Sequence, residues 1–221
     1  MTWQIFTSAW QEVLHQLPNR CILKSAAEIA CGGFPKAGLA VQQLFPDTKI
    51  FYIDTCATAL EHCKERLHAC LPTQSASFLQ YSLDDHSIPM TVDLILGNHV
   101  LDDILLRHYL HQINAEITDP YHSPDFYLKT VSDVILYYTK NTHAYVEKLL
   151  DTFDYLLNPQ GLILLSDYTS YYETFYKLTE RPHYRFNLLE KMTGYLHQKG
   201  YTQFNPNLPD VFSHLGAWMK S

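Results

Sequence analysis

Residues 26–54 read AAEIACGGFPKAGLAVQQLFPDTKIFYID, the pattern of a strand, a glycine turn, a helix and a second strand that ends on an acid. The glycines Gly32 and Gly33 let the backbone approach a ligand closely, and the N–H groups at the start of the following helix suit an anionic carboxylate. The carboxylate of Asp54 can accept hydrogen bonds from both hydroxyls of a ribose, or it can cap the helix that begins near 56. This stretch predicts a site for a small ligand that carries a nucleoside.

Length, charge and cysteine content narrow the class of protein. The 221 residues suit a single domain, and the formal net charge of −7 comes without a basic stripe, so nucleic acid is not the expected partner. The start of the chain lacks the features of a signal peptide, and no apolar run approaches about 18 residues, so we expect no membrane span. Five cysteines without CxxC pairs favour a reducing, cytoplasmic location.

Three of the cysteines belong to a regular stripe. Cys56, Leu60, Cys63, Leu67 and Cys70 recur at helical spacing, which indicates one helix face directed at a core. Free cysteine packs in such a position as a small hydrophobic residue, and this interpretation is preferred over a metal site.

Short apolar runs and helical periodicities alternate along the chain. An amphipathic helix is expected within residues 1–20. Further helices are predicted at 35–45, 56–70, 142–157 and 186–198, and strands at 26–30, 49–53, 76–80, 92–97, 161–166, 201–205 and 212–219. This alternation predicts a mainly parallel, doubly wound α/β sheet in one domain spanning 1–221. The last two strands are too close for a helix between them, so they are expected to pair antiparallel.

The segment 102–141 interrupts the alternation, because it is much longer than one crossover helix. It is rich in aromatic residues, and helices are expected near 102–114 and 125–139. Insertions at the carboxyl edge of such a sheet commonly cover the ligand. A cap over the site and a surface or dimer helix pair are both open interpretations.

Four motifs in order resemble those of class I S-adenosylmethionine-dependent methyltransferases. They are EIACGG at 28–33, FYID at 51–54, VDLILGNHVL at 92–101 and LLNPQGLIL at 156–164, within a resemblance that covers roughly residues 24–219. The resemblance implies a three-layer Rossmann-like methyltransferase fold with strand order 3-2-1-4-5-7-6 and an antiparallel last strand. Two departures stand out: Ala30 replaces the first glycine of the family, and Phe34 stands where a third is often found.

The resemblance also implies S-adenosyl-L-methionine as the cofactor and a set of residues that hold it. The acid of the second motif, Asp54, is expected on the ribose, and Asp84 or its neighbour Asp85 on the adenine, although both can equally be solvated loop residues. The full expected cofactor set is Glu28, Ala30, Cys31, Gly32, Gly33, Asp54, Thr55, Asp84, Asn98 and His99.

Deprotonation of an oxygen or nitrogen nucleophile would need a base near the fourth and fifth strand ends. His99 is the first candidate and Tyr168 a further one, although pocket lining is the more common role of such residues. The leading hypothesis is a methyltransferase that acts on a small-molecule acceptor by direct in-line transfer. The alternative is a non-catalytic nucleoside-binding or structural protein that keeps the fold. A nicotinamide-dependent oxidoreductase ranks third, because G-x-G-x-x-G is absent.

Overall fold

The structure is a computed structural model that describes residues 3–18, 23–72, 76–83, 88, 90–113, 129–130, 133–134, 145–168 and 180–221. Within these ranges, the backbone alone is described for 102, 103, 107, 111 and 180–187. Most of the insertion at 102–141, including the helix expected at 125–139, lies outside the described residues, as does Asp84.

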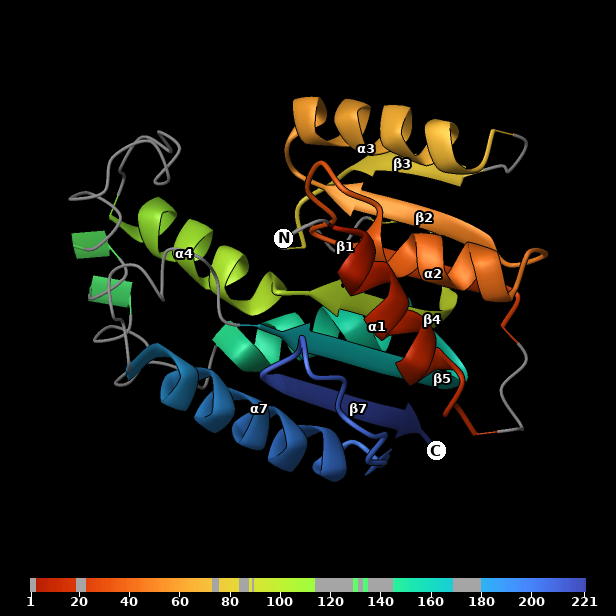
Figure 1. Cartoon of the computed structure of the whole chain (residues 1–221). Coiled ribbons are helices and arrows are strands. Elements are labelled where there is room, and N and C mark those ends of the chain that lie inside the picture. The colour runs from red at the N-terminus through yellow and green to blue at the C-terminus, as the bar shows by residue number, and fades with distance from the viewer. Residues whose placement is uncertain are drawn as a thin grey trace.

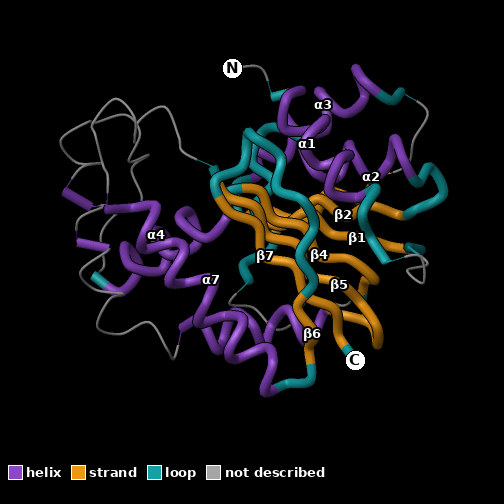
Figure 2. The backbone as a smooth tube through the Cα atoms, turned by 60° about the horizontal axis from the view of Figure 1, so that its bottom comes forward, coloured by secondary structure: helices purple, strands orange, loops and turns teal. Residues whose placement is uncertain are grey.

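Seven strands form one sheet (Figure 2), in the order β3-β2-β1-β4-β5-β7-β6. The neighbouring strands from β3 to β5 pair in parallel, and β7 pairs antiparallel with both β5 and β6. The strand order and the antiparallel last strand that the sequence predicts are therefore confirmed. The strands are β1 (Ser25–Ile29), β2 (Lys49–Asp54), β3 (Ala76–Gln80), β4 (Val92–Asn98), β5 (Leu157–Asp167), β6 (Tyr201–Gln203) and β7 (His214–Lys220).

Helices cover both faces of the sheet and make it the middle of three layers (Figure 1). One face packs against α1 (Gln4–Leu14), α2 (Lys36–Leu44) and α3 (Ala57–Cys70). The other face packs against α4 (Val100–Gln112), a helix at 145–156 and α7 (Glu180–Gln198). Both faces are buried, which explains why β4 and β5 read as continuous apolar runs rather than as alternating ones.

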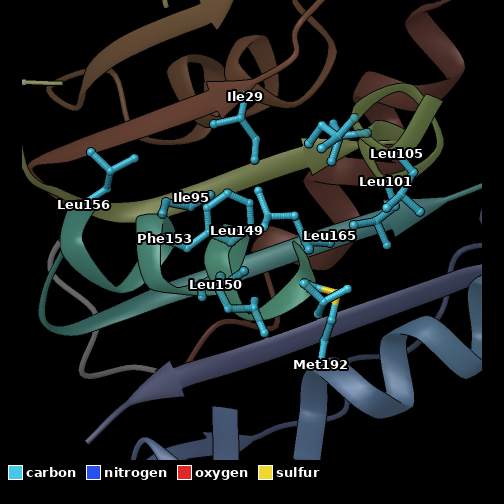
Figure 3. Packing of buried hydrophobic residues seen from close by; sticks show 14 of the residues in the cluster. Ile29, Ile95, Leu101, Leu105, Leu149, Leu150, Phe153, Leu156, Leu165 and Met192 are labelled. Carbon is cyan, nitrogen blue, oxygen red and sulfur yellow. The ribbon is translucent and has the colours of Figure 1, made fainter. Parts of the chain in front are cut away.

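The core on the second face gathers side chains from the sheet and from three helices (Figure 3). Phe153 and Leu150, from the helix at 145–156, are fully buried against Ile95 of β4 and Leu165 of β5. Truncating a buried phenylalanine such as Phe153 to alanine costs about 3–5 kcal/mol of stability. This packing fixes the distance between the helix layer and strands β4 and β5, whose ends carry several of the predicted site residues.

The amino edge of the sheet is held by the aspartate of the third motif. The carboxylate of Asp93 accepts hydrogen bonds from the backbone N–H groups of Lys24 and Ser25 and from the side-chain amide of Asn158. Burial alone would raise the pKa of Asp93, but these hydrogen bonds hold it below its usual value. Asp93 therefore joins the starts of β1, β4 and β5, at the edge of the sheet opposite to the carboxyl ends of these strands.

The starts of β5 and α7 differ most from those that the sequence predicts, whereas the bounds of the other labelled strands and helices shift by at most two residues. Strand β5 begins at Leu157 rather than near 161, because Leu157 pairs with Val92 before the register shifts and Leu162 pairs with Leu94. Gln160, in the bulge between them, adopts a positive φ of 65°. Helix α7 begins at Glu180 rather than 186, since Pro182 falls in its first turn, where a missing N–H is tolerated.

The cysteine and leucine stripe of α3 is directed at the core only along its middle. Cys63, Leu60 and Leu67 are buried, whereas Cys70 is exposed at the end of the helix. The predicted stripe is therefore too long by one residue at its carboxyl end. No helix in the described part of the chain is long and apolar enough to span a membrane.

Candidate active site

The carboxyl ends of four adjacent strands bring the predicted site residues to one edge of the sheet. Ile29 of β1 pairs with Ile53 of β2 on one side and with Gly97 of β4 on the other, and Asn98 of β4 pairs with Ser166 of β5. The turn after β1, the acid that ends β2 and the residues that follow β4 and β5 are therefore neighbours. Helix α4 starts from this edge (Figure 1).

The glycine turn after β1 contains two residues in the left-handed region. Gly32 has a φ of +60°, and a Cβ added there would meet nothing within 4 Å, so the turn borders open space at this point. Ala30 has a φ of +47°, which an L-residue adopts at a cost of about 1–2 kcal/mol. Ala30, which stands where the resembling family has a glycine, is therefore strained.

The carboxylate of Asp54 is shared between the glycine turn and the start of α3. It accepts a hydrogen bond from the N–H of Gly32 at 2.9 Å and another from the N–H of Cys56 at 2.9 Å. A carboxylate has about four acceptor positions, so these two bonds leave capacity for ligand hydroxyls. The two roles that the sequence allows for Asp54, helix cap and ribose ligand, are therefore compatible.

Glu28 faces the start of α2 rather than the open side of the glycine turn. Its side chain is buried, and its two oxygens accept hydrogen bonds from the N–H groups of Ala37 and Gly38 in the first turn of α2. Burial raises the pKa of Glu28 to about 7, although these N–H groups and nearby Lys36 favour its charged form. Glu28 caps α2 and fixes its start relative to the glycine turn.

Cys31 also points away from the open side of the turn. It is buried against Cys63 of α3, whose thiol, together with burial, raises the pKa of Cys31 far above its usual value. A thiol in this state is a packing residue rather than a nucleophile. Thr55, which follows Asp54, is exposed.

The residue that follows β4 and the last residue of β5 form a histidine–aspartate pair. Nδ1 of His99 lies 2.5 Å from Oδ1 of Asp167, which also accepts the N–H of Tyr168. The Tyr168 ring lies against the imidazole, with ring centres 4.3 Å apart. His99 has a φ of +60°, a strained conformation for a residue with a side chain. Strained residues thus follow both β1 and β4 at the same edge.

Asn98 connects this edge to the N-terminal helix. Its side-chain oxygen accepts hydrogen bonds from the indole N–H of Trp10 at 3.0 Å and from the hydroxyl of Ser166 at 3.1 Å, which fixes the orientation of the amide. Its side-chain nitrogen is buried and has no hydrogen-bond partner among the residues that the structure describes. A buried donor without a partner is costly, and such groups gather where a ligand or water completes the bonding.

Three partners in this site are not apparent from the sequence motifs. Trp10 lies 88 positions before Asn98, and Asp167 lies 68 positions after His99, so neither pair is apparent from a local motif. Arg66 of α3 also reaches the glycine turn, where its Nη1 donates to the carbonyl oxygen of Gly33. The pairing of β4 with β5 is the signal that brings His99 and Asp167 together, since each comes directly after a member of the last β4–β5 pair, Asn98 and Ser166.

The fold and the order of its strands are matched by solved structures, whereas no family model and no curated protein matches the sequence. The plantazolicin methyltransferase BpumL, solved in complex with SAH, is 16% identical, with a TM-score of 0.56 over 99% of this chain and 84% of that one. This is the class I methyltransferase fold. The identity is low, so the likeness extends to the methyltransferase fold alone.

Other structures with the methyltransferase fold are longer than this chain. The pyocyanin biosynthetic protein PhzM is 12% identical, with a TM-score of 0.57 over 96% of this chain and 54% of its own. An O-methyltransferase family protein from Burkholderia thailandensis is 12% identical, with a TM-score of 0.58 over 99% of this chain and 56% of its own. The chain spans little more than half the length of these two proteins.

Proposed function

We propose that the protein is an S-adenosylmethionine-dependent methyltransferase that acts on a small-molecule acceptor. The observation that carries the proposal is the meeting of the glycine turn, Asp54 and the His99–Asp167 pair at one edge of a sheet with the methyltransferase fold. The open space beside Gly32 leaves room for a ligand at this edge, and the amide nitrogen of Asn98 lacks a partner among the described residues. The solved methyltransferases of this fold, one of them with SAH bound, support the choice of donor.

The residues at this edge divide between holding the donor and accepting a proton. Gly32 and Asp54 would hold the nucleoside, and Asp54 has acceptor capacity left for ribose hydroxyls. When bound, S-adenosylmethionine supplies a methyl group on a sulfonium that is already a good leaving group. The protein mainly contributes proximity, alignment and exclusion of water to an in-line transfer.

His99 is the proposed general base. Donation of the Nδ1 hydrogen to Asp167 assigns the lone pair of the neutral imidazole to Nε2, which can then take a proton from an acceptor hydroxyl or amine. Asp167 holds the ring in this tautomer and stabilises the imidazolium that forms. Tyr168, which packs against the imidazole, is proposed to line the acceptor side of the site.

Calorimetric titration with S-adenosylhomocysteine tests the donor site. The wild-type protein is expected to bind, and Asp54→Asn is expected to weaken binding by tenfold or more, because a hydrogen bond to a charged group contributes about 1.5–3 kcal/mol. Asp47→Asn, at an exposed acid before β2, is the matched control and should bind like the wild type. No binding by the folded wild-type protein would refute the proposal.

Turnover separates the enzyme from the alternative, a binding protein that keeps the fold without catalysis. The strain at Ala30 is the observation that favours the alternative, since it marks a glycine turn altered from that of the family. Phenols, amines and carboxylic acids are incubated with methyl-labelled donor, and products are counted. For any acceptor found, His99→Gln should lower turnover by about 10²–10⁴-fold in a protein that still binds S-adenosylhomocysteine. Binding without any labelled product would select the alternative.

A further inference from the structure

The guanidinium of Arg66 lies against the glycine turn on the side of α3. Its Nη1 donates a hydrogen bond to the carbonyl oxygen of Gly33, and its Cζ lies 3.9 Å from the centre of the Phe34 ring. A Cβ added to Gly33 would lie 2.8 Å from the same Nη1, so a side chain at 33 would displace the guanidinium. Glycine at 33 is therefore explained by Arg66 rather than by a φ requirement.

The Phe34 ring contacts an aromatic residue from a third segment of the chain. The ring centres of Phe34 and Trp3 are 6.2 Å apart at an interplanar angle of 43°. Trp3 immediately precedes α1, the helix whose Trp10 bonds to Asn98 at the end of β4. The contacts of Phe34 with Trp3 and with Arg66 thus join α1, the glycine turn and α3.

Phe34 stands at the position where the resembling family often has a third glycine. Its ring contacts both Arg66 and Trp3. A planar guanidinium can donate to a carbonyl and lie over a ring at the same time, which the ammonium of lysine does less well. The replacement of a glycine by Phe34 therefore comes with a partner that holds it.

We propose that Arg66 is a positioning residue for the methyl donor: it fixes the glycine turn through Gly33 and Phe34, so that the turn is already in its binding conformation. This inference rests on the proposed function. A turn that is ordered before binding loses less conformational freedom when the ligand arrives, which raises affinity without a direct contact. Removal of Arg66 should then weaken donor binding while the fold stays intact.

The test is calorimetric titration of the full chain with S-adenosylhomocysteine, together with thermal unfolding of each variant. Arg66→Met is expected to raise Kd about tenfold, equivalent to about 1.4 kcal/mol. Arg66→Lys, which keeps the charge and loses the planar fork, should give an intermediate Kd. Lys64→Met, at an exposed position two residues earlier on α3, is the matched control and should bind like the wild type. The Tm of Arg66→Met should stay within about 2 °C of that of the wild type.

A double-mutant cycle adds a second readout. If Arg66 acts through the ring of Phe34, the effects of Arg66→Met and Phe34→Leu on Kd are less than additive when combined. Additive effects would overturn the part assigned to Phe34. Equal Kd values for wild type and Arg66→Met, or a weaker Kd with a Tm lower by more than about 4 °C, would overturn the positioning role and leave the proposed function standing. Failure of the wild-type protein to bind would overturn both.

Discussion

Replacing Glu28 by glutamine is expected to abolish a pH dependence of stability that this one residue confers. Burial raises the pKa of Glu28 from 4.5 to about 7 in the folded chain. Each unit of such a shift corresponds to about 1.4 kcal/mol, so the full effect amounts to about 3 kcal/mol. Glutamine has a similar shape and no charge, and it can accept a hydrogen bond from one of the two N–H groups that Glu28 now caps.

The sign of this pH dependence follows from which state, folded or unfolded, keeps the Glu28 proton. Between pH 4.5 and about 7 the unfolded chain has released the Glu28 proton while the folded chain keeps it. The folded state binds more protons, so this group makes the free energy of unfolding fall as the pH rises through that window and level off above it. The wild type should therefore lose about 2–3 kcal/mol relative to Glu28→Gln between pH 5 and pH 8.

Chemical denaturation at intervals between pH 5 and pH 8 measures this difference. Other titrating groups, including the twelve histidines, are shared by the two proteins and cancel in the comparison. Glu65→Gln, on the exposed surface of α3, serves as the matched control. If the curves for wild type and Glu28→Gln run parallel, Glu28 is ionised in the folded chain and its N–H partners outweigh the cost of burial.

Three further comparisons of variants test the backbone geometry of the site and of its scaffold by thermal unfolding. Ala30→Gly should raise Tm by about 2–4 °C, because it relieves about 1 kcal/mol of left-handed strain, and an unchanged or lower Tm would contradict the strain. His99→Gly should be about 1 kcal/mol more stable than His99→Ala for the same reason, and equal stabilities would count against it. Gly38→Ala should lower the stability by about 1–3 kcal/mol, since its Cβ would lie 2.7 Å from the Tyr52 ring. Gly194→Ala, in open space on α7, should raise the stability by up to about 1 kcal/mol. Similar effects of the two substitutions would refute the packing argument.

The fold can be predicted from the sequence because its strands are buried on both faces. Runs such as VDLIL at 92–96 are almost continuously apolar, which is the pattern of a strand covered on both faces. The short link between β6 and β7 has no room for a crossover helix, so these strands pair antiparallel. The boundaries were less predictable. The bulge after Leu157 depends on pairing with Val92, which no local pattern in β5 reveals.

The candidate site could be predicted by position but not by contact. The sequence places Glu28 and Asp54 beside the glycine turn, and both are there. It does not show that Glu28 points into the first turn of α2, because helices cover both faces of the sheet and alternation alone does not choose between them. The partners of His99 and Asn98 come from segments 68 and 88 residues away, so they follow from register and helix packing rather than from motifs.

The positions of the three tryptophans make the intrinsic fluorescence of the protein sensitive to the glycine turn. Trp10 and Trp218 are fully buried and donate their indole N–H to Asn98 and Thr193, so collisional quenchers such as acrylamide should reach their emission poorly. Trp3 is partly exposed and lies against Phe34 in the glycine turn. The readily quenched fraction of the fluorescence should therefore come from Trp3, and a ligand that shifts the turn should change that fraction without any label on the chain.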